Sequence, residues 1–426
     1  MKPRVALLPW GDVFEDWLDP LGVTPEQFRD EVTGSWLFGY VDALRTAGVA
    51  TVLVCFTSRV STQVRWVHRP TGATLYLIPS GRAFALVARH MLREPIGDRR
   101  DPRTIMRASL RNIAPYLATP VRKLARLVRK EECSAILCQE YETPRFDWSI
   151  AAGLLAEVPV FASFQGGDYH VSRIEGAVRR FTIHRADRVI VPTRTEAERI
   201  RRRYGIANGK VAQIFNPIDV DLWRPGGRDE ARSHLGIVDG TLLVVWHGQL
   251  QLRRKGLDLL LAAWSELVHA RIRGPLQLLL IGAGEDAEEL RRHVDERRIE
   301  GVEILDEWIN ERDRVAQLLS AGDLYVFPSR HEGFPVAPME AMACGLPVVA
   351  TDVSGITEIF PRGEADGGIV VERENVASLA AAMARLLNDD ETRVELGRRA
   401  RARAEAAFSL SAVGRDLRRV LLREAE

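Results

Sequence analysis

The sequence contains only four cysteines, and their spacing matches no metal site. All four, Cys55, Cys133, Cys138 and Cys344, fall in apolar runs, so we expect free buried thiols and a reducing compartment. No apolar run approaches the roughly 18 residues that a membrane-spanning helix needs. The short apolar stretch at the N-terminus soon turns acidic, which predicts a first strand rather than a signal peptide. Together these absences predict a cytoplasmic protein.

Excess charge of either sign is also missing. The chain holds 59 Lys and Arg against 58 Asp and Glu, a formal net charge of +1, so no overall charge attracts it to nucleic acid. We find neither a short-period repeat nor a low-complexity tail, and hydrophobic residues make up 46% of the sequence. A chain of 426 residues suits two globular domains of about 200 residues each.

One segment, residues 82–130, is strongly basic but has few aromatic residues among its charges, which argues against nucleic acid. Near its end Val121, Leu124, Leu127 and Val128 form an apolar stripe between arginines and lysines. A basic amphipathic helix of this kind either lies on anionic lipid or covers a sheet with its charges in water, and the sequence leaves both open. The first alternative predicts peripheral contact with the inner face of a membrane.

Strand-like runs alternate with helical patterns along the chain, which predicts an α/β fold with parallel, doubly wound sheets. In the first half the expected strands are Val5–Leu8, Thr51–Phe56, Ala135–Cys138, Val160–Phe164 and Arg188–Val191, and the helices include Ser35–Ala47, Pro120–Lys130 and Arg194–Tyr204. In the second half the expected strands are Leu242–Trp246, Leu276–Ile281, Val302–Leu305, Leu324–Phe327 and Val348–Ala350, before a helical end from Val376 to Leu422. Two prolines and two glycines between Phe215 and Gly227 mark a linker between the halves.

The most informative block runs from Pro328 to Glu358. Glu332 stands in a loop after a strand, and Glu340 stands eight residues later in the helical run Ala337–Cys344. A loop that ends at a helix N-terminus favours a phosphate, because free backbone N–H groups point out of it. A carboxylate inside the helix can accept hydrogen bonds from a ribose diol, and the loop carboxylate can reach a neighbouring sugar. The competing interpretation is a solvated loop carboxylate and a surface helical glutamate.

This block resembles the retaining glycosyltransferases of family 4, whose Glu-x7-Glu signature is matched by Glu332, Gly333, Phe334, Pro335 and Glu340. The resemblance implies the GT-B fold, with two Rossmann-like domains facing across a cleft. It implies an acceptor-side domain over residues 1–216, joined by a C-terminal helix within 408–426 that crosses back, and a donor domain over residues 217–407. The donor would be a nucleoside diphosphate sugar, a UDP- or GDP-sugar, and no other cofactor and no metal are implied.

The resemblance also assigns roles within the signature. Glu340 would bind the ribose and Glu332 the hydroxyls of the transferred sugar. The backbone of Gly333, Phe334 and Val336 would bind the diphosphate, to which Pro335 offers no N–H.

After the strand Leu242–Trp246 the family places a glycine, an arginine and a lysine near the diphosphate. Gly248 and Lys255 match, but Gln249 stands at the usual arginine position. Arg253 or Arg254 could supply the second cation. A cation here would stabilise the charge that grows on the leaving phosphate. The alternative is a basic solvated loop that precedes a helix.

Further candidates rest on weaker matches. In the first half, Gln165 replaces a family histidine that bonds the transferred sugar, Asp168 is an acceptor-side candidate, and Gly34 matches an N-terminal glycine loop. Three acids after the strand Ala135–Cys138, Glu140, Glu142 and Asp147, either line the acceptor cleft or lie in a solvated loop. In the second half, Gly284 belongs to a tight strand-to-helix turn close to the nucleotide, since the third glycine of a dinucleotide fingerprint is missing. Residues 302–310 would run past the base.

No carboxylate pair stands beside the signature to hold a divalent ion, and Asp219 with Asp221 falls in the linker, where solvation is the simpler interpretation. The sequence therefore predicts metal-independent transfer of a sugar, with retention, to a hydroxyl of a glycan, lipid-linked or small-molecule acceptor. The alternatives are a sugar phosphorylase or nucleotide-sugar epimerase of the same fold, or a catalytically weak binding subunit. The last is supported by Gln249 and Gln165.

Overall fold

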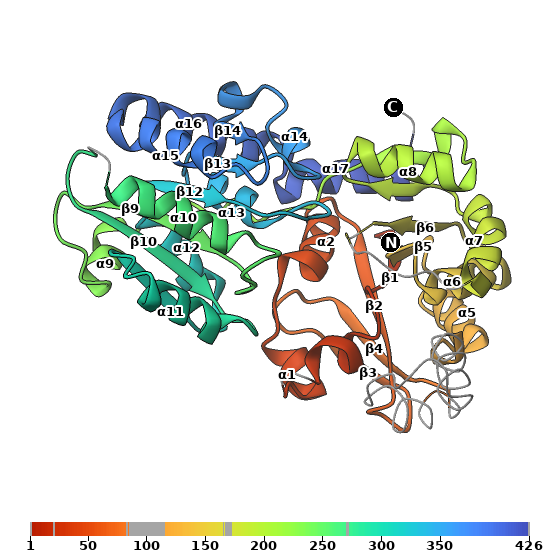
Figure 1. Cartoon of the computed structure of the whole chain (residues 1–426). Coiled ribbons are helices and arrows are strands. Elements are labelled where there is room, and N and C mark those ends of the chain that lie inside the picture. Colours follow the sequence, from red (N-terminus) through yellow and green to blue (C-terminus); the bar gives the residue numbers. More distant parts are fainter. Residues whose placement is uncertain are drawn as a thin grey trace, which may run out of the picture. The chain divides into compact units, whose positions relative to one another are not determined.

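The structure is a computed structural model that describes residues 2–19, 22–81, 84, 116–164, 166, 173–269 and 272–424. The chain forms two compact units, one made of Met1–Phe215 with Val413–Glu426 and the other of Asn216–Ala412. Figure 1 shows a parallel sheet with helices on its faces in each unit. The predicted α/β fold with doubly wound sheets is therefore confirmed.

In the described part of the N-terminal unit, eight strands form one sheet in the order β3-β4-β2-β1-β5-β6-β7-β8, parallel except for the antiparallel pair β3–β4. The strands are β1 (Arg4–Leu8), β2 (Ala50–Thr57), β3 (Val64–Val67), β4 (Thr74–Pro79), β5 (Ala135–Gln139), β6 (Val160–Ser163), β7 (Val189–Val191) and β8 (Val211–Gln213). The helices are α1 (Pro25–Asp30), α2 (Ser35–Thr46), α5 (Val121–Lys130), α6 (Pro144–Ala156), α7 (Arg173–Arg185), α8 (Arg194–Tyr204) and α17 (Leu410–Leu421), with a π-helical turn at Val13–Leu18 and a 3-10 turn at Asn208–Lys210.

The predicted strands of this unit lie within two residues of the observed ones, whereas β3, β4 and β8 were not predicted. β3 and β8 are sheet edges of four and three residues whose side chains are half exposed. Short edge strands carry too few apolar residues to stand out as a periodic run. Most central strands, by contrast, are continuous buried runs, which are visible in the sequence because both of their faces are covered.

Helix α5 decides between the two interpretations of the basic stripe. Leu124, Leu127 and Val128 are buried in the core of the N-terminal unit, and Val121 packs against it. The basic residues of the helix are exposed. The helix therefore covers the sheet with its charges in water, and its apolar stripe is not available to lipid. Most of the basic segment before Tyr116 lies outside the described residues.

The three acids that follow β5 do not lie in a solvated loop, because Glu140, Glu142 and Asp147 are all buried. Asp147, in the first turn of α6, accepts two hydrogen bonds from the fully buried guanidinium of Arg179 on α7, at 2.8 and 2.9 Å. Glu142 forms ion pairs with Arg199 and Arg203 of α8. Asp147 thus joins α6 to α7, and Glu142 joins the segment before α6 to α8. The solvated-loop interpretation of these acids is therefore wrong.

In the described part of the C-terminal unit, six parallel strands form a sheet in the order β11-β10-β9-β12-β13-β14. The strands are β9 (Leu242–His247), β10 (Leu276–Gly282), β11 (Val302–Asp306), β12 (Leu324–Phe327), β13 (Val348–Thr351) and β14 (Gly368–Val371). The helices are α9 (Arg228–His234), α10 (Leu257–Val268), α11 (Ala287–Glu296), α12 (Arg312–Ser320), α13 (Ala337–Ala343), α14 (Ile356–Ile359), α15 (Val376–Asn388) and α16 (Asp390–Ala407), with a 3-10 turn at Gly363–Asp366.

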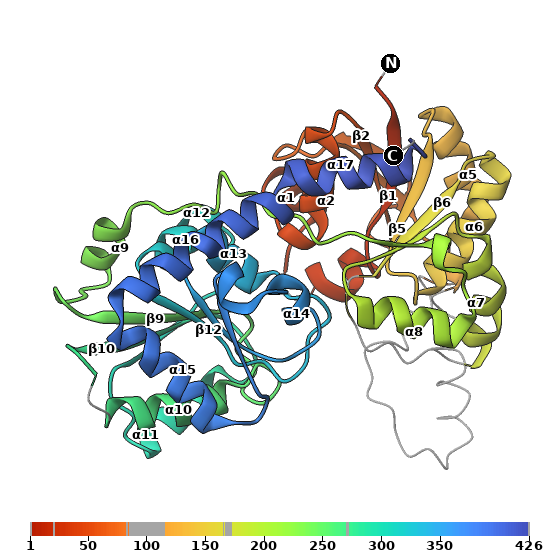
Figure 2. The same ribbon diagram turned by 90° about the horizontal axis from the view of Figure 1, so that it is seen from above.

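The predicted C-terminal helical stretch consists of three helices, α15, α16 and α17. Asp389 caps the start of α16 through a side-chain bond to Thr392 N at 3.0 Å, and Phe408 ends that helix. The last helix, α17, lies along α2 within the N-terminal unit, where Arg418 Nη1 donates to the carbonyl of Ala47 at 2.9 Å (Figure 2).

All four cysteines are free and buried, as the sequence predicted. Burial raises the pKa of the Cys55 and Cys344 thiols to about 12. Among the described residues, none of the helices is both long and apolar enough to span a membrane.

We predict that Arg179→Met lowers the free energy of unfolding of the N-terminal unit by about 3–5 kcal/mol, because it leaves the Asp147 carboxylate buried without its cation. Urea denaturation of the whole chain measures the change. Arg202→Met is the matched control, since Arg202 forms an exposed pair with Glu198 that contributes at most about 1 kcal/mol. Two variants of equal stability would contradict the structural role of the Arg179–Asp147 pair.

Candidate functional site

The sheet of the C-terminal unit changes winding direction between β9 and β12. β9 is flanked on its other side by β10 and β12 by β13, so the loops that follow β9 and β12 leave the sheet toward opposite sides. In open parallel sheets the crevice outside the carboxyl ends of two such strands is where ligands bind. The loop after β9, residues 248–256, and the loop after β12, residues 328–336, meet at this edge.

Backbone contacts hold these two loops together. Gly256, with φ +68°, sits so close to Pro328 that a Cβ would lie 2.0 Å from the Pro328 carbonyl oxygen. The backbone N–H of Arg330 donates to the carbonyl of Arg254 at 3.0 Å, and its guanidinium donates to the carbonyl of Arg253 at 2.7 Å. Arg330 also pairs with both Asp258 and Glu374. No sequence pattern singles out Arg330, because only the fold brings its partners near.

Lys255 and Glu332 form an ion pair across the two loops. Lys255 Nζ lies 2.7 Å from Glu332 Oε1, and both side chains are largely buried. Ser329 Oγ donates to the same oxygen at 2.6 Å. The carbonyl of Ser329 accepts a bond from the Thr351 hydroxyl at the end of β13, also at 2.6 Å. The geometry therefore fixes the Lys255 ammonium at the carboxyl edge of β12.

Glu340 pairs with His247, the last residue of β9. The His247 Nε2 atom lies 2.9 Å from Glu340 Oε2, and both side chains are close to nine-tenths buried. The His247 ring packs edge-on against Tyr325 of β12, with ring centroids 5.5 Å apart, and its Nδ1 atom is buried with no hydrogen-bond partner among the described residues. The sequence pattern predicts a strand that ends at Trp246, and it predicts no role for His247. The one sequence feature that points to His247 as a site residue is its position directly before Gly248.

The remaining signature residues, Gly333, Phe334 and Val336, lie in the loop after β12 and at the start of α13. Phe334 is buried and its ring packs against Phe408, with centroids 6.4 Å apart, so its side chain belongs to the core. The carbonyl of Gly333 accepts a bond from Ser354 Oγ at 3.1 Å. Val336 is the residue from which α13 starts, and Glu340 lies in the first turn of that helix.

A third loop, residues 282–286 after β10, packs onto the loop after β9. Gly248 N donates to Ile281 O and Leu250 N donates to Ala283 O, each at 3.0 Å. At Gly282, with φ +146°, a Cβ would lie 1.8 Å from the Gly248 carbonyl oxygen. A Cβ at Gly284 would likewise meet the Leu250 carbonyl oxygen at 2.2 Å. These contacts require glycine for backbone packing, which fits a tight strand-to-helix turn.

Neither Arg253 nor Arg254, the two candidates for the second cation, is held at the edge by contacts with the other site residues. Arg253 is 80% exposed and pairs with Asp258 at 2.8 Å. The Arg254 guanidinium has no ion pair or hydrogen bond to the described residues, and it is exposed. Gln249 is exposed as well. Of the two arginines, Arg254 is therefore the one whose cation is uncommitted.

The other predicted residues lie in the N-terminal unit, in the linker or outside the described residues. Gly34 lies in the N-terminal unit, where it precedes α2. Gln165 and Asp168 lie outside the described residues. Asp219 accepts hydrogen bonds from the backbone N–H groups of Asp221 and Leu222, at 3.1 and 3.2 Å, which is a turn-capping role. Within the described residues, no cluster of three or more His, Cys, Asp or Glu side chains could hold a metal ion.

The arrangement offers anion and hydroxyl binding at one edge. An ammonium group has three N–H donors, and Lys255 spends one on Glu332, which leaves two for the oxygens of a phosphate. The second oxygen of Glu332 and the carboxylate of Glu340 are acceptors for hydroxyl groups. The edge therefore suits a ligand that carries both phosphate and sugar.

Two family models match the chain. The model described as Glycosyltransferase Family 4 matches residues 36–222, and the model described as Glycosyl transferases group 1 matches residues 241–389. The first lies in the N-terminal unit and the linker, and the second lies in the C-terminal unit.

Curated relatives match about half of the chain. D-inositol 3-phosphate glycosyltransferase 1 of Catenulispora acidiphila is 32% identical over 213 residues, which are 48% of this chain and 50% of the relative. D-inositol 3-phosphate glycosyltransferase of Nocardia farcinica is 32% identical over 236 residues, which are 53% of this chain and 50% of the relative. The chain thus spans about half the length of the curated relatives it matches.

Solved structures are similar over nearly the whole chain. Sucrose-phosphate synthase from Thermosynechococcus elongatus has a TM-score of 0.67 at 21% identity, over 99% of this chain and 98% of that one. Anabaena HepE in complex with UDP has a TM-score of 0.70 at 17% identity, over 98% of this chain and 99% of that one. At these identities the likeness shows the fold. With a matching family model in each unit and this fold, the chain belongs to the glycosyltransferases of family 4 and has the GT-B fold.

Proposed function

We propose that this protein transfers a sugar from a nucleoside diphosphate sugar to a hydroxyl group of an acceptor, with retention of anomeric configuration. The observation that carries the proposal is the pairing of Lys255 with Glu332 and of His247 with Glu340 at the carboxyl edge of β9 and β12. The paired residues come from the family signature and from the loop after β9. UDP-sugars are the first donors to test, because HepE was solved with UDP, and GDP-sugars are the second.

In this proposal the C-terminal unit binds the donor and the N-terminal unit the acceptor. Glu340 binds the ribose diol, and Glu332 binds hydroxyls of the transferred sugar. Lys255 contacts the diphosphate together with backbone groups of Gly333, Phe334 and Val336. The bond between the anomeric carbon and the leaving phosphate breaks while the acceptor oxygen bonds to the same face of that carbon. The acceptor proton passes to the leaving phosphate, whose growing charge Lys255 stabilises.

The acceptor is proposed by class only. The similar relatives are named for D-inositol 3-phosphate, which makes an inositol phosphate the first acceptor to try. Release of UDP or GDP from a panel of nucleotide sugars, with and without inositol phosphates, simple sugars and lipid-linked sugars, tests the function. No release of either nucleotide from any donor, while UDP still binds, would favour a binding subunit instead.

Glu340→Ala is predicted to weaken UDP binding about ten- to a hundredfold, because a charge-assisted hydrogen bond to the ribose is worth roughly 1.5–3 kcal/mol. Isothermal titration calorimetry measures the affinity, and thermal unfolding checks that the variant folds. Glu296→Ala, an exposed glutamate of α11, is the matched control and should bind UDP normally. Equal affinity of the two variants would refute the ribose assignment.

Lys255→Ala is predicted to lower kcat more than it raises the donor KM, because the charge on the leaving phosphate is largest in the transition state. Steady-state kinetics with the best donor separate the two constants. Arg253→Ala should leave kcat nearly normal, since Arg253 points to solvent and pairs with Asp258. If Lys255→Ala retains kcat and Arg254→Ala loses it, the role belongs to Arg254.

Transfer is predicted to persist in excess EDTA and to give a product with the anomeric configuration of the donor. The physical reason is that Lys255, an arginine nearby and backbone N–H groups neutralise the diphosphate without a divalent ion. Nucleotide release with added chelator and NMR of the product are the two measurements. Loss of activity in EDTA that magnesium or manganese restores contradicts the donor model, and an inverted product contradicts the mechanism.

A further inference from the structure

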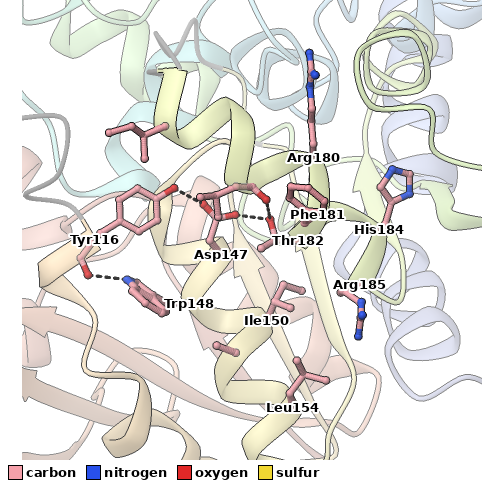
Figure 3. Close-up of a pocket in the computed structure, with 13 residues that line it drawn as sticks. Tyr116, Asp147, Trp148, Ile150, Leu154, Arg180, Phe181, Thr182, His184 and Arg185 are labelled. Carbon is pink, nitrogen blue, oxygen red and sulfur yellow. Dashed lines mark hydrogen bonds between the residues drawn. The ribbon is translucent and has the colours of Figure 1, made fainter.

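The N-terminal unit has a second feature that the donor edge does not explain. A cavity of about 890 Å³ opens between α6 and α7 (Figure 3). Its walls include Ile150 and Leu154 of α6 and Ile174 and Phe181 of α7. Tyr116 closes one end, where its hydroxyl donates to Asp147 at 2.7 Å and its carbonyl accepts from the Trp148 indole at 2.6 Å. The walls are thus mostly apolar, and two of their polar groups already bond each other.

Three large apolar residues of this groove are exposed to solvent to an unusual degree. Phe181 is 78% exposed, Leu154 63% and Ile174 51%. A single exposed apolar side chain needs no explanation, but three large ones beside one apolar cavity mark a surface that another body covers. The buried stripe of α5 is a separate feature, because its residues face the core.

Cations surround the groove. Arg180, His184 and Arg185 of α7 line it, all three are exposed, and none of their side chains forms an ion pair or hydrogen bond with the described residues. Figure 3 shows these three side chains extending away from the apolar wall. The one acid in the described lining, Asp147, is satisfied by Arg179, Thr182 and Tyr116. The free charge at the rim is therefore positive.

We infer that this face docks on an anionic lipid surface, with Phe181, Leu154 and Ile174 at the hydrocarbon boundary and Arg180 and Arg185 on lipid phosphates. An apolar face flanked by unpaired cations is what an anionic interface binds, through buried apolar area and electrostatic attraction together. A protein partner fits less well, because protein interfaces have polar rims that offer partners of both signs. The inference stands apart from the proposed transfer reaction, because none of its residues belongs to the donor edge.

Co-sedimentation of the full chain with vesicles tests it. The protein should bind vesicles that contain phosphatidylglycerol, bind phosphatidylcholine vesicles much more weakly, and lose affinity as salt is raised. Phe181→Ser should weaken binding about tenfold, and Arg180→Gln or Arg185→Gln about fivefold each. Val394→Ser on α16 and Arg292→Gln on α11 are matched exposed controls that should bind like the wild type. UDP affinity, measured on the same variants, should not change.

The other outcomes overturn the inference in distinct ways. No binding to either kind of vesicle, or normal binding by Phe181→Ser, would show that the groove does not contact lipid. A lowered melting temperature of Phe181→Ser without vesicle binding would mean that another part of this chain covers the groove. A dimer in light scattering that Phe181→Ser dissociates, again without vesicle binding, would identify a second copy as the occupant. Failure of the donor-site proposal would appear in UDP affinity and leave these results unchanged.

Discussion

The parallel pairing of β9 with β12 is the constraint on which the candidate site depends. The register Leu324↔Val244 and Tyr325↔Val245 places the carboxyl ends of the two strands side by side. Since the chain leaves β9 toward β10 and β12 toward β13, the loops after β9 and β12 leave the sheet toward opposite sides, and backbone bonds join them at this edge. A shift of this register would separate His247 from Glu340 and Lys255 from Glu332. The site is therefore a property of strand order more than of any one loop.

Lys255 and Glu332 at this edge form an ion pair with each other. Removing the Lys255 and Glu332 charges from water carries a desolvation cost that their mutual attraction offsets only in part. Such a pair is weak evidence that the fold is stabilised. It does hold the Lys255 ammonium group in one place, with two N–H donors left for a ligand. Arg330, whose pKa is raised by the Asp258 carboxylate, plays a different part because all its bonds go to protein and it clasps the two loops. Lys255 thus keeps N–H donors for a ligand, whereas Arg330 holds the two loops together.

The same residue types serve a different end in the N-terminal unit. After β5, buried acids pair with arginines: Asp147 with the buried Arg179, and Glu142 with the partly exposed Arg199. Burial raises the pKa of the neighbouring Glu196, while bonds from Arg199 and Tyr141 favour its charged form. Glu140, at the end of β5, adopts φ +76°, a conformation that non-glycine residues rarely take and that often marks functional edges. In this unit, ion pairs hold α6, α7 and α8 together, whereas the basic residues of α5 and the Arg180 and Arg185 side chains of α7 are exposed.

The sequence by itself determined most strands of the two sheets, all but β3, β4, β8 and β14, and the signature from Glu332 to Glu340. These are local patterns, a buried run of four to eight residues or a fixed spacing, and they need no knowledge of distant partners. It also indicated Lys255, because the family places a lysine there. Only the tertiary structure decided that His247 meets Glu340 across 93 positions, that Arg330 is a clasp, that Asp147 is buried, and that the stripe of α5 faces the core. It also decided that Phe181 stands out beside a cavity. The reason is physical: charge and hydrophobicity read along a chain do not say which side chains will be desolvated together, since strand order and helix packing bring distant residues into contact.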